Sequence, residues 1–165
     1  MPELLIRIKK RADGSAALSC VRADGSTTWQ RQEGRSGEFF PRHDLTHYAV
    51  ETVLGHRRGF FGLVAEGWDL ADFGSPWPKG PIPADAEPSE AIVGLLDFER
   101  YQGAKVSAAD LRERLGMVEG ASLVDVLSLV TEEELEAIRA RRAELFARWD
   151  ALPVGETLEL PFDRR

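Results

Sequence analysis

The residues best suited to chemistry in this sequence are its three histidines, which lie close together at positions 43, 47 and 56. Histidine has an ordinary pKa close to neutral pH, and its neutral ring is a common metal ligand. His43 and His47 are four positions apart, Asp44 lies between them, and Glu51 follows four positions after His47. The search for a functional site therefore begins with this segment.

The segment is expected to be helical over residues 41–54. Pro41 suits the first turn of a helix, Asp44 complements its positive end, and Gly55 suits the position just past its end. Apolar residues recur on one side of this helix, as they do where a helix faces a core. The sequence thus predicts an amphipathic helix that ends in a short turn.

Helical geometry gathers four ionisable side chains on the side opposite the apolar face. At about 100° per residue, His47, Glu51 and Asp44 lie within roughly 100° of His43 around the helix axis. Two histidines at this spacing sit one turn apart, so both rings can reach the same point. We therefore expect a compact polar face that is suited to binding or catalysis.

A divalent metal ion such as zinc is the leading interpretation, with His43 and His47 as ligands. Histidines four positions apart are the arrangement of H-E-x-x-H metal sites, and neutral imidazole suits zinc, iron, nickel and copper. A third ligand must come from elsewhere. Glu66 is the first choice if the next helix folds back on this one, and His56 and Asp69 remain alternatives.

The carboxylates suggest a metal-dependent hydrolase, in which Asp44 and Glu51 would take part in catalysis. Glu51 could instead orient His47 by accepting a hydrogen bond from its ring. Without a metal, a histidine paired with either carboxylate could act as a general acid or base. The alternative from another class is a non-catalytic binding or interaction protein that uses the same face, and a solvated surface without function is the third interpretation.

The rest of the chain predicts an α+β fold. The first thirty residues read as a β-meander, because apolar residues alternate and the turn sequence Arg-Ala-Asp-Gly-Ser occurs twice. A last strand must join this small antiparallel sheet, because a lone strand is not stable. The expected strands cover about 3–10, 16–22, 26–31 and 157–162, and the further helices about 59–68, 88–102, 108–115 and 132–150.

Two segments interrupt this pattern. Residues 74–88 contain five of the nine prolines and are expected to form a loop that lies over the body of the protein. Residues 121–130 fit a strand and a helix equally well. Because the last strand returns to the first sheet, residues 1–165 are expected to form a single domain.

Composition excludes some partners. The net charge is −7, and it divides into +3 for residues 1–60 and −10 for residues 61–165. An acidic bulk argues against nucleic acid and anionic membranes as partners, and no apolar run approaches the ~18 residues of a membrane span. The single cysteine, Cys20, favours a reducing cytoplasmic location. A small-molecule or protein partner remains open.

The segments 39–51 and 59–68 resemble a group of small uncharacterised bacterial proteins with an HDLTHYAVE motif, and this resemblance implies no activity. The H-D-x-x-H core is also similar to that of a ubiquinone-biosynthesis family with a zinc motif. That family has a glutamate twelve residues after the second histidine, where this chain has Gly59. The function is therefore not transferred. The zinc-protease motif is matched only in its two histidines, since Asp44 replaces the catalytic glutamate.

Overall fold

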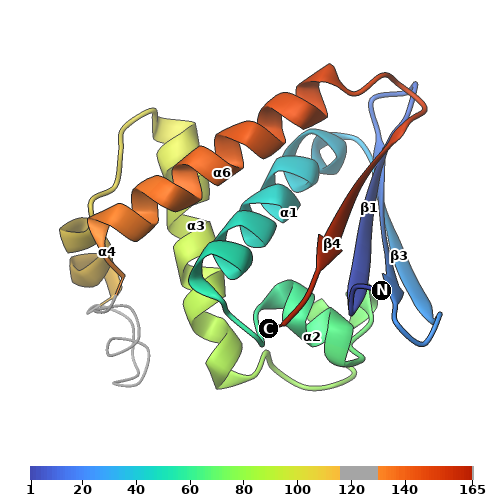
Figure 1. The fold of residues 1–165 in the computed structure, drawn as a ribbon, viewed down its shortest axis with the longest axis horizontal. Coiled ribbons are helices and arrows are strands. Elements are labelled where there is room, and N and C mark those ends of the chain that lie inside the picture. Colours follow the sequence, from blue (N-terminus) through green and yellow to red (C-terminus); the bar gives the residue numbers. More distant parts are fainter. Residues whose placement is uncertain (116–129, 165) are drawn as a thin grey trace.

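The computed structural model describes residues 1–115 and 130–164 and confirms the α+β class (Figure 1). A meander of three strands comes first, a set of helices follows, and the last strand ends the chain. The strands are β1 (Leu4–Lys10), β2 (Ala16–Arg22), β3 (Thr27–Gln32) and β4 (Thr157–Phe162), and the helices are α1 (Arg35–Leu54), α2 (Phe60–Glu66), α3 (Glu87–Gln102), α4 (Ala108–Leu115) and α6 (Glu132–Ala151).

The four strands form one antiparallel sheet in the order β3-β2-β1-β4. The prediction that the last strand joins the N-terminal meander is confirmed, because β4 pairs with β1 and places Leu160 opposite Ile6. Alternate residues of β1 and β4 are buried, including Ile6, Ile8, Leu158 and Leu160, so one face of these strands carries the apolar side chains.

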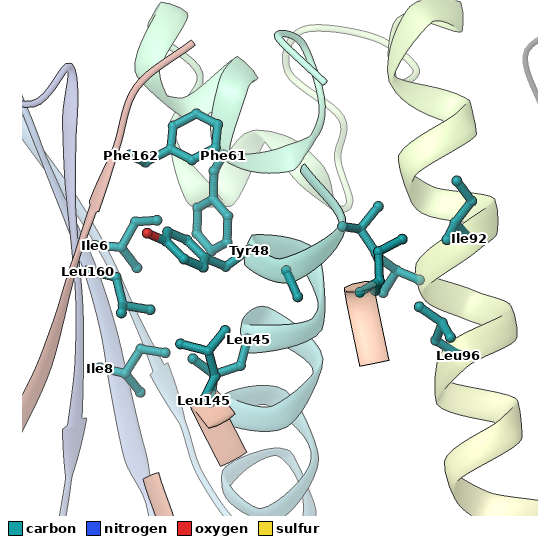
Figure 2. Packing of buried hydrophobic residues seen from close by; sticks show 14 of the residues in the cluster. Ile6, Ile8, Leu45, Tyr48, Phe61, Ile92, Leu96, Leu145, Leu160 and Phe162 are labelled. Atoms are coloured by element: carbon teal, nitrogen blue, oxygen red, sulfur yellow. The ribbon is translucent and has the colours of Figure 1, made fainter. Parts of the chain in front are cut away.

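Helix α1 lies between the sheet and α3 (Figure 1). Figure 2 shows Leu45 and Tyr48 of α1 facing Ile6 and Leu160 of the sheet, while side chains of α3 approach from the opposite side of α1. Helix α6 packs along α1 as well. Because neighbours cover α1 on several sides, most of its residues from Asp44 to Glu51 are buried whether apolar or polar.

The predicted start of the α1 helix was wrong. We expected a helix over 41–54, but α1 begins at Arg35 and Pro41 lies inside it. Proline inside a helix lacks the amide that would bond the carbonyl four residues earlier, here that of Gly37. The aromatic rings of this first part pack together, since the ring of Phe39 stacks on that of His43 at a centroid distance of 5.1 Å.

The other expected helices are present, with ends that differ by a few residues. Thr131 and Glu134 form a capping box at the start of α6. The proline-rich segment contains the short 3-10 helix Ala84–Ala86 and otherwise runs as a loop. The ambiguous segment 121–130 lies outside the described residues except for its last position. Within the described chain, no helix has both the length and the apolar character needed to span a membrane.

A buried ion-pair network connects α3 to α6. The carboxylate of Glu99 accepts hydrogen bonds from Arg139 at 2.8 and 3.1 Å, from Arg142 at 3.1 Å and from the amide of Val106 at 2.9 Å. Burial of Glu99 opposes its ionisation, but these hydrogen bonds and the two arginine charges lower its pKa overall. The network therefore holds α3, and everything that α3 presents to α1, in a fixed position.

We predict that Glu99→Gln lowers the free energy of unfolding by about 3 kcal/mol near pH 7, because it leaves two largely buried arginines without their shared carboxylate. A carboxyl group with a lowered pKa stabilises the fold above its unfolded pKa, so the loss should shrink as the pH falls below about 4. Urea unfolding at several pH values measures both effects. Glu136→Gln is the control, since Glu136 also pairs with Arg139 but its side chain is 55% exposed, and a comparable loss there would contradict the prediction.

Candidate functional site

A pocket of about 380 Å³ opens beside α1, between the end of β3, the start of α2 and α3, and the loop that follows α2. This volume is at the small end of the range for ligand pockets. The lining combines ionisable side chains from α1 and α3 with aromatic and aliphatic ones from the surrounding segments. The lining residues are Gln30, Phe40, His43, Asp44, His47, Phe60, Leu70, Ala71, Phe73, Gly74, Ser75, Ile82 and Glu90.

A polar face opposite an apolar face is typical of a helix on the surface. In this structure, however, the polar face of α1 is buried. Asp44, His47 and Glu51 are only 3%, 1% and 1% exposed. The helix forms as predicted, so the four ionisable groups do share one side of it, but α2, α3 and β3 cover that side. Each group must therefore find a partner inside the protein, since burying an unpaired polar group is costly.

His43 is held by α3. Its Nδ1 lies 2.6 Å from Oδ2 of Asp97, which leaves Nε2 as the other ring nitrogen. Burial alone would lower the pKa of His43, but the hydrogen bond to Asp97 and the charges of Asp44, Asp97 and Glu90 raise it overall. His43 is therefore oriented by a carboxylate and lies on the pocket wall, an arrangement suited both to proton transfer and to metal binding.

His47 lies deeper, and burial lowers its pKa to about 4, so its ring is neutral at physiological pH. Its Nε2 is 3.7 Å from Oε2 of Glu90, and its Nδ1 is 3.4 Å from Oε2 of Glu51. Although these distances fall within ion-pair range, Nδ1 of His47 and Oε2 of Glu51 have no hydrogen-bond partner within the described chain. We treat this contact as one between two neutral groups, because burial disfavours charge on both.

The two imidazoles meet edge to face. Their ring centroids are 4.8 Å apart, and the ring planes are inclined by 80°. In the described residues, no group of three His, Cys, Asp or Glu side chains is placed to hold a metal ion. His43, His47 and Glu90 all line the pocket, and Asp97 and Glu51 lie near the Nδ1 atoms of the two rings. The geometry thus provides two adjacent imidazoles and one nearby carboxylate.

Asp44 contacts the sheet rather than the histidines. Its Oδ2 accepts a hydrogen bond of 2.8 Å from Nε2 of Gln32, at the end of β3. Burial raises the pKa of Asp44 to about 7, although the bond from Gln32 and the charge of His43 act against this rise. A carboxyl group that titrates near neutral pH and lines a pocket can both accept and release a proton, which fits the catalytic role expected for Asp44.

Glu51 connects α1 to α2. Its Oε1 accepts hydrogen bonds from the backbone amides of Phe61 and Gly62, at 3.0 and 3.2 Å. Gly59 packs directly on the carboxyl group, since a Cβ there would lie 2.4 Å from Cδ of Glu51. Position 59 therefore has no room for the glutamate that the ubiquinone-biosynthesis family carries. Burial raises the pKa of Glu51 to about 8 against the effect of these amides.

The structure does not bring the proposed third ligands to the histidine pair. The carboxylate of Glu66 accepts hydrogen bonds from Arg58 at 2.9 and 3.2 Å, and Glu66 does not line the pocket. Asp69 pairs with Arg22 at 2.9 Å. His56 turns toward α3, where its Nδ1 lies 2.5 Å from a serine hydroxyl. The helix hairpin that would have placed Glu66 beside His47 does not occur, because α2 is short and turns its first residues toward Glu51.

Sequence reasoning missed Glu90 and Asp97, the two α3 carboxylates that approach the histidines. One signal for them was available, because Glu90 and Asp97 are seven positions apart. Residues at this spacing lie on the same face of a helix, two turns apart. This spacing shows that the two side chains share a face, but not that the face meets α1. Gln32 was also missed, because nothing in a strand sequence indicates which helix its end will contact.

The comparisons with known proteins find no relative: no family model, no curated protein and no solved structure matches this chain. The contacts, burial and charge of the pocket residues are therefore what indicates the function.

We predict that Glu51→Gln changes the pH dependence of stability. Because the folded protein raises the pKa of Glu51 above its unfolded value, the native state keeps a proton that the unfolded chain loses, and wild-type stability falls as the pH rises from about 5 to about 8. The neutral glutamine removes this contribution. The difference in free energy of unfolding between the wild type and the variant should change by on the order of 1 kcal/mol per pH unit. Chemical unfolding across this range measures it, and parallel profiles would contradict the prediction.

Proposed function

We propose that the pocket binds one divalent metal ion through His43 and His47, with Glu90 as the adjacent carboxylate, and that the protein is a small metal-dependent hydrolase. Glu90 takes the place that the sequence had suggested for Glu66. The proposal concerns a first-row ion such as zinc, since the donors are imidazole nitrogen and carboxylate oxygen.

One observation carries this proposal: two adjacent imidazoles line the pocket, and each has a carboxyl group near its Nδ1. Asp97 lies 2.6 Å from Nδ1 of His43, and Glu51 lies 3.4 Å from Nδ1 of His47 without a hydrogen bond between them. Metal-binding histidines commonly donate one ring N–H to a carboxylate, which fixes the ring and leaves the other nitrogen for the metal. His43 has this arrangement, and the ring of His47 lies beside it at a centroid distance of 4.8 Å, close enough to bind the same ion.

The protonation state of His47 supports the same proposal. Only neutral imidazole binds a metal, and burial keeps His47 neutral by lowering its pKa to about 4. Glu90 is 3.7 Å from Nε2 of His47, and its side chain is 34% exposed, so it has room to turn toward an ion. Binding would require a small adjustment of Glu90, together with water or substrate at the remaining positions.

Hydrolysis is the reaction class that these residues suit best. A divalent ion lowers the pKa of a bound water, so that a hydroxide nucleophile is available near neutral pH. Asp44 lines the same pocket and has a pKa of about 7, so it can take up the proton of the attacking water and return it to the leaving group. The hydroxide of the water and its proton are then added across the cleaved bond of the substrate, and no oxidant or reductant is needed.

A second candidate is acid–base catalysis without a metal. The 2.6 Å contact between His43 and Asp97 favours it, since a carboxylate that orients a histidine is a common general-base pair. In this case His43 would exchange protons with a substrate in the pocket, and His47 would shape the wall. The two candidates share residues and differ in whether a metal ion is present.

We predict that the purified protein, dialysed against zinc and then against buffer, retains about one metal ion per chain, and that His47→Ala retains none. Loss of one of two imidazole ligands should weaken binding at least tenfold. Atomic emission or a chromophoric chelator measures the metal content. His43→Ala should behave in the same way.

His56→Ala is the matched control. It removes an imidazole of the same chemistry that lies near the end of α1, bonds a serine and does not line the pocket. This variant should retain metal at the wild-type level. A wild-type protein without metal, or equal loss from all three variants, would contradict the metal proposal and leave the acid–base candidate.

A further inference from the structure

The part of the pocket away from the histidines is apolar and aromatic. The ring of Phe60 lies 5.1 Å from that of His47 and 4.6 Å from that of Phe73, so the three rings continue one wall. Leu70 and Ile82 line the same pocket. Phe60 and Phe73 are only partly buried and are therefore available to a ligand. This surface can receive an organic group that lies next to the polar end.

The acidic residues that line the pocket are not balanced by lysine or arginine. In the part of the chain that the structure describes, the pocket is lined by the carboxyl groups of Asp44 and Glu90 but by no lysine or arginine. When His43 is protonated, it shares the carboxylate of Asp97 with Arg100, at 2.6 and 3.4 Å, and Arg100 does not line the pocket. A ligand with a phosphate or a second anionic group would therefore meet two acidic side chains and no lysine or arginine to pair with.

Nearby basic side chains already have acidic partners. Lys79 lies 3.5 Å from Asp72, and Arg58 binds Glu66 and Asp85. None of these residues lines the pocket. These two cations are therefore already paired and do not supply a positive charge to the pocket.

From these two observations we infer the substrate class: a small, largely apolar molecule, such as one with an aromatic ring, whose polar group is uncharged or positively charged. Its ring packs against Phe60 and Phe73, and its polar group meets the histidines and Glu90. Phosphorylated compounds and other dianions are excluded. The inference rests on the proposed function only in taking this pocket as the binding site, and its charge selectivity applies to the metal-free pocket, because a bound divalent ion would itself attract an anion.

Three probes with the same ring test the inference: benzyl alcohol, benzylamine and benzyl phosphate. They are neutral, cationic and dianionic near pH 8, so they separate charge from shape. Binding is measured by protein-observed NMR in EDTA, so that failure of the metal proposal does not affect the result. We expect the alcohol and the amine to shift amide resonances around Phe60 and Phe73, and the phosphate to bind at least tenfold more weakly.

Three variants locate the effect. Phe73→Ala should weaken binding of the alcohol and the amine several-fold, while Phe98→Ala, which removes an exposed ring of α3 outside the pocket lining, should not. Glu90→Gln should weaken the amine but not the alcohol, and it is less prone to unfold the protein because Glu90 is partly exposed. Three results would overturn the inference. Benzyl phosphate could bind as tightly as benzyl alcohol, neither benzyl alcohol nor benzylamine could bind, or the two phenylalanine variants could have equal effects.

Discussion

The burial of the polar side of α1 is the constraint on which the rest of the structure depends. A helix between a sheet and other helices would ordinarily be apolar all round, yet α1 presents Asp44, His47 and Glu51 to its covered side. Desolvation disfavours charge on all three, and it moves the pKa of both carboxyl groups up and that of the histidine down. The surrounding elements are arranged so that each group has a neighbour, and the pocket forms where these neighbours leave space.

Each covering element contributes to this arrangement. The end of β3 provides Gln32 for Asp44, and the first turn of α2 provides backbone amides for Glu51. Helix α3 provides carboxylates for the histidines, and the buried pairs of Glu99 with α6 fix the position of α3. The aromatic wall follows from the same contacts, because the residues that bond Glu51 adjoin Phe60. Stability and the candidate site thus use the same interfaces.

Local patterns were enough to predict much of the fold. Alternation of apolar residues and repeated Asp-Gly turns indicated the meander, and the capping pair of Thr131 and Glu134 fixed the start of α6. The need to pair a lone strand predicted the place of β4. The start of α1 could not be predicted in this way, because tertiary packing of its aromatic residues tolerates a proline inside the helix. For the site, spacing placed His43 and His47 together, whereas Glu90 and Asp97 depend on which face of α3 meets α1, and no local rule gives that.

The proposed function requires His43 and His47 to share one metal ion through their Nε2 atoms. Titration of ¹⁵N-histidine-labelled protein with Zn²⁺, followed by the ring nitrogen resonances, tests this directly. We expect Nε2 of His43 and His47 to shift together and saturate at one equivalent, while the Nδ1 resonances keep the protonated form and His56 stays unchanged. Shifts confined to His56, or no shift at either pocket histidine, would contradict it.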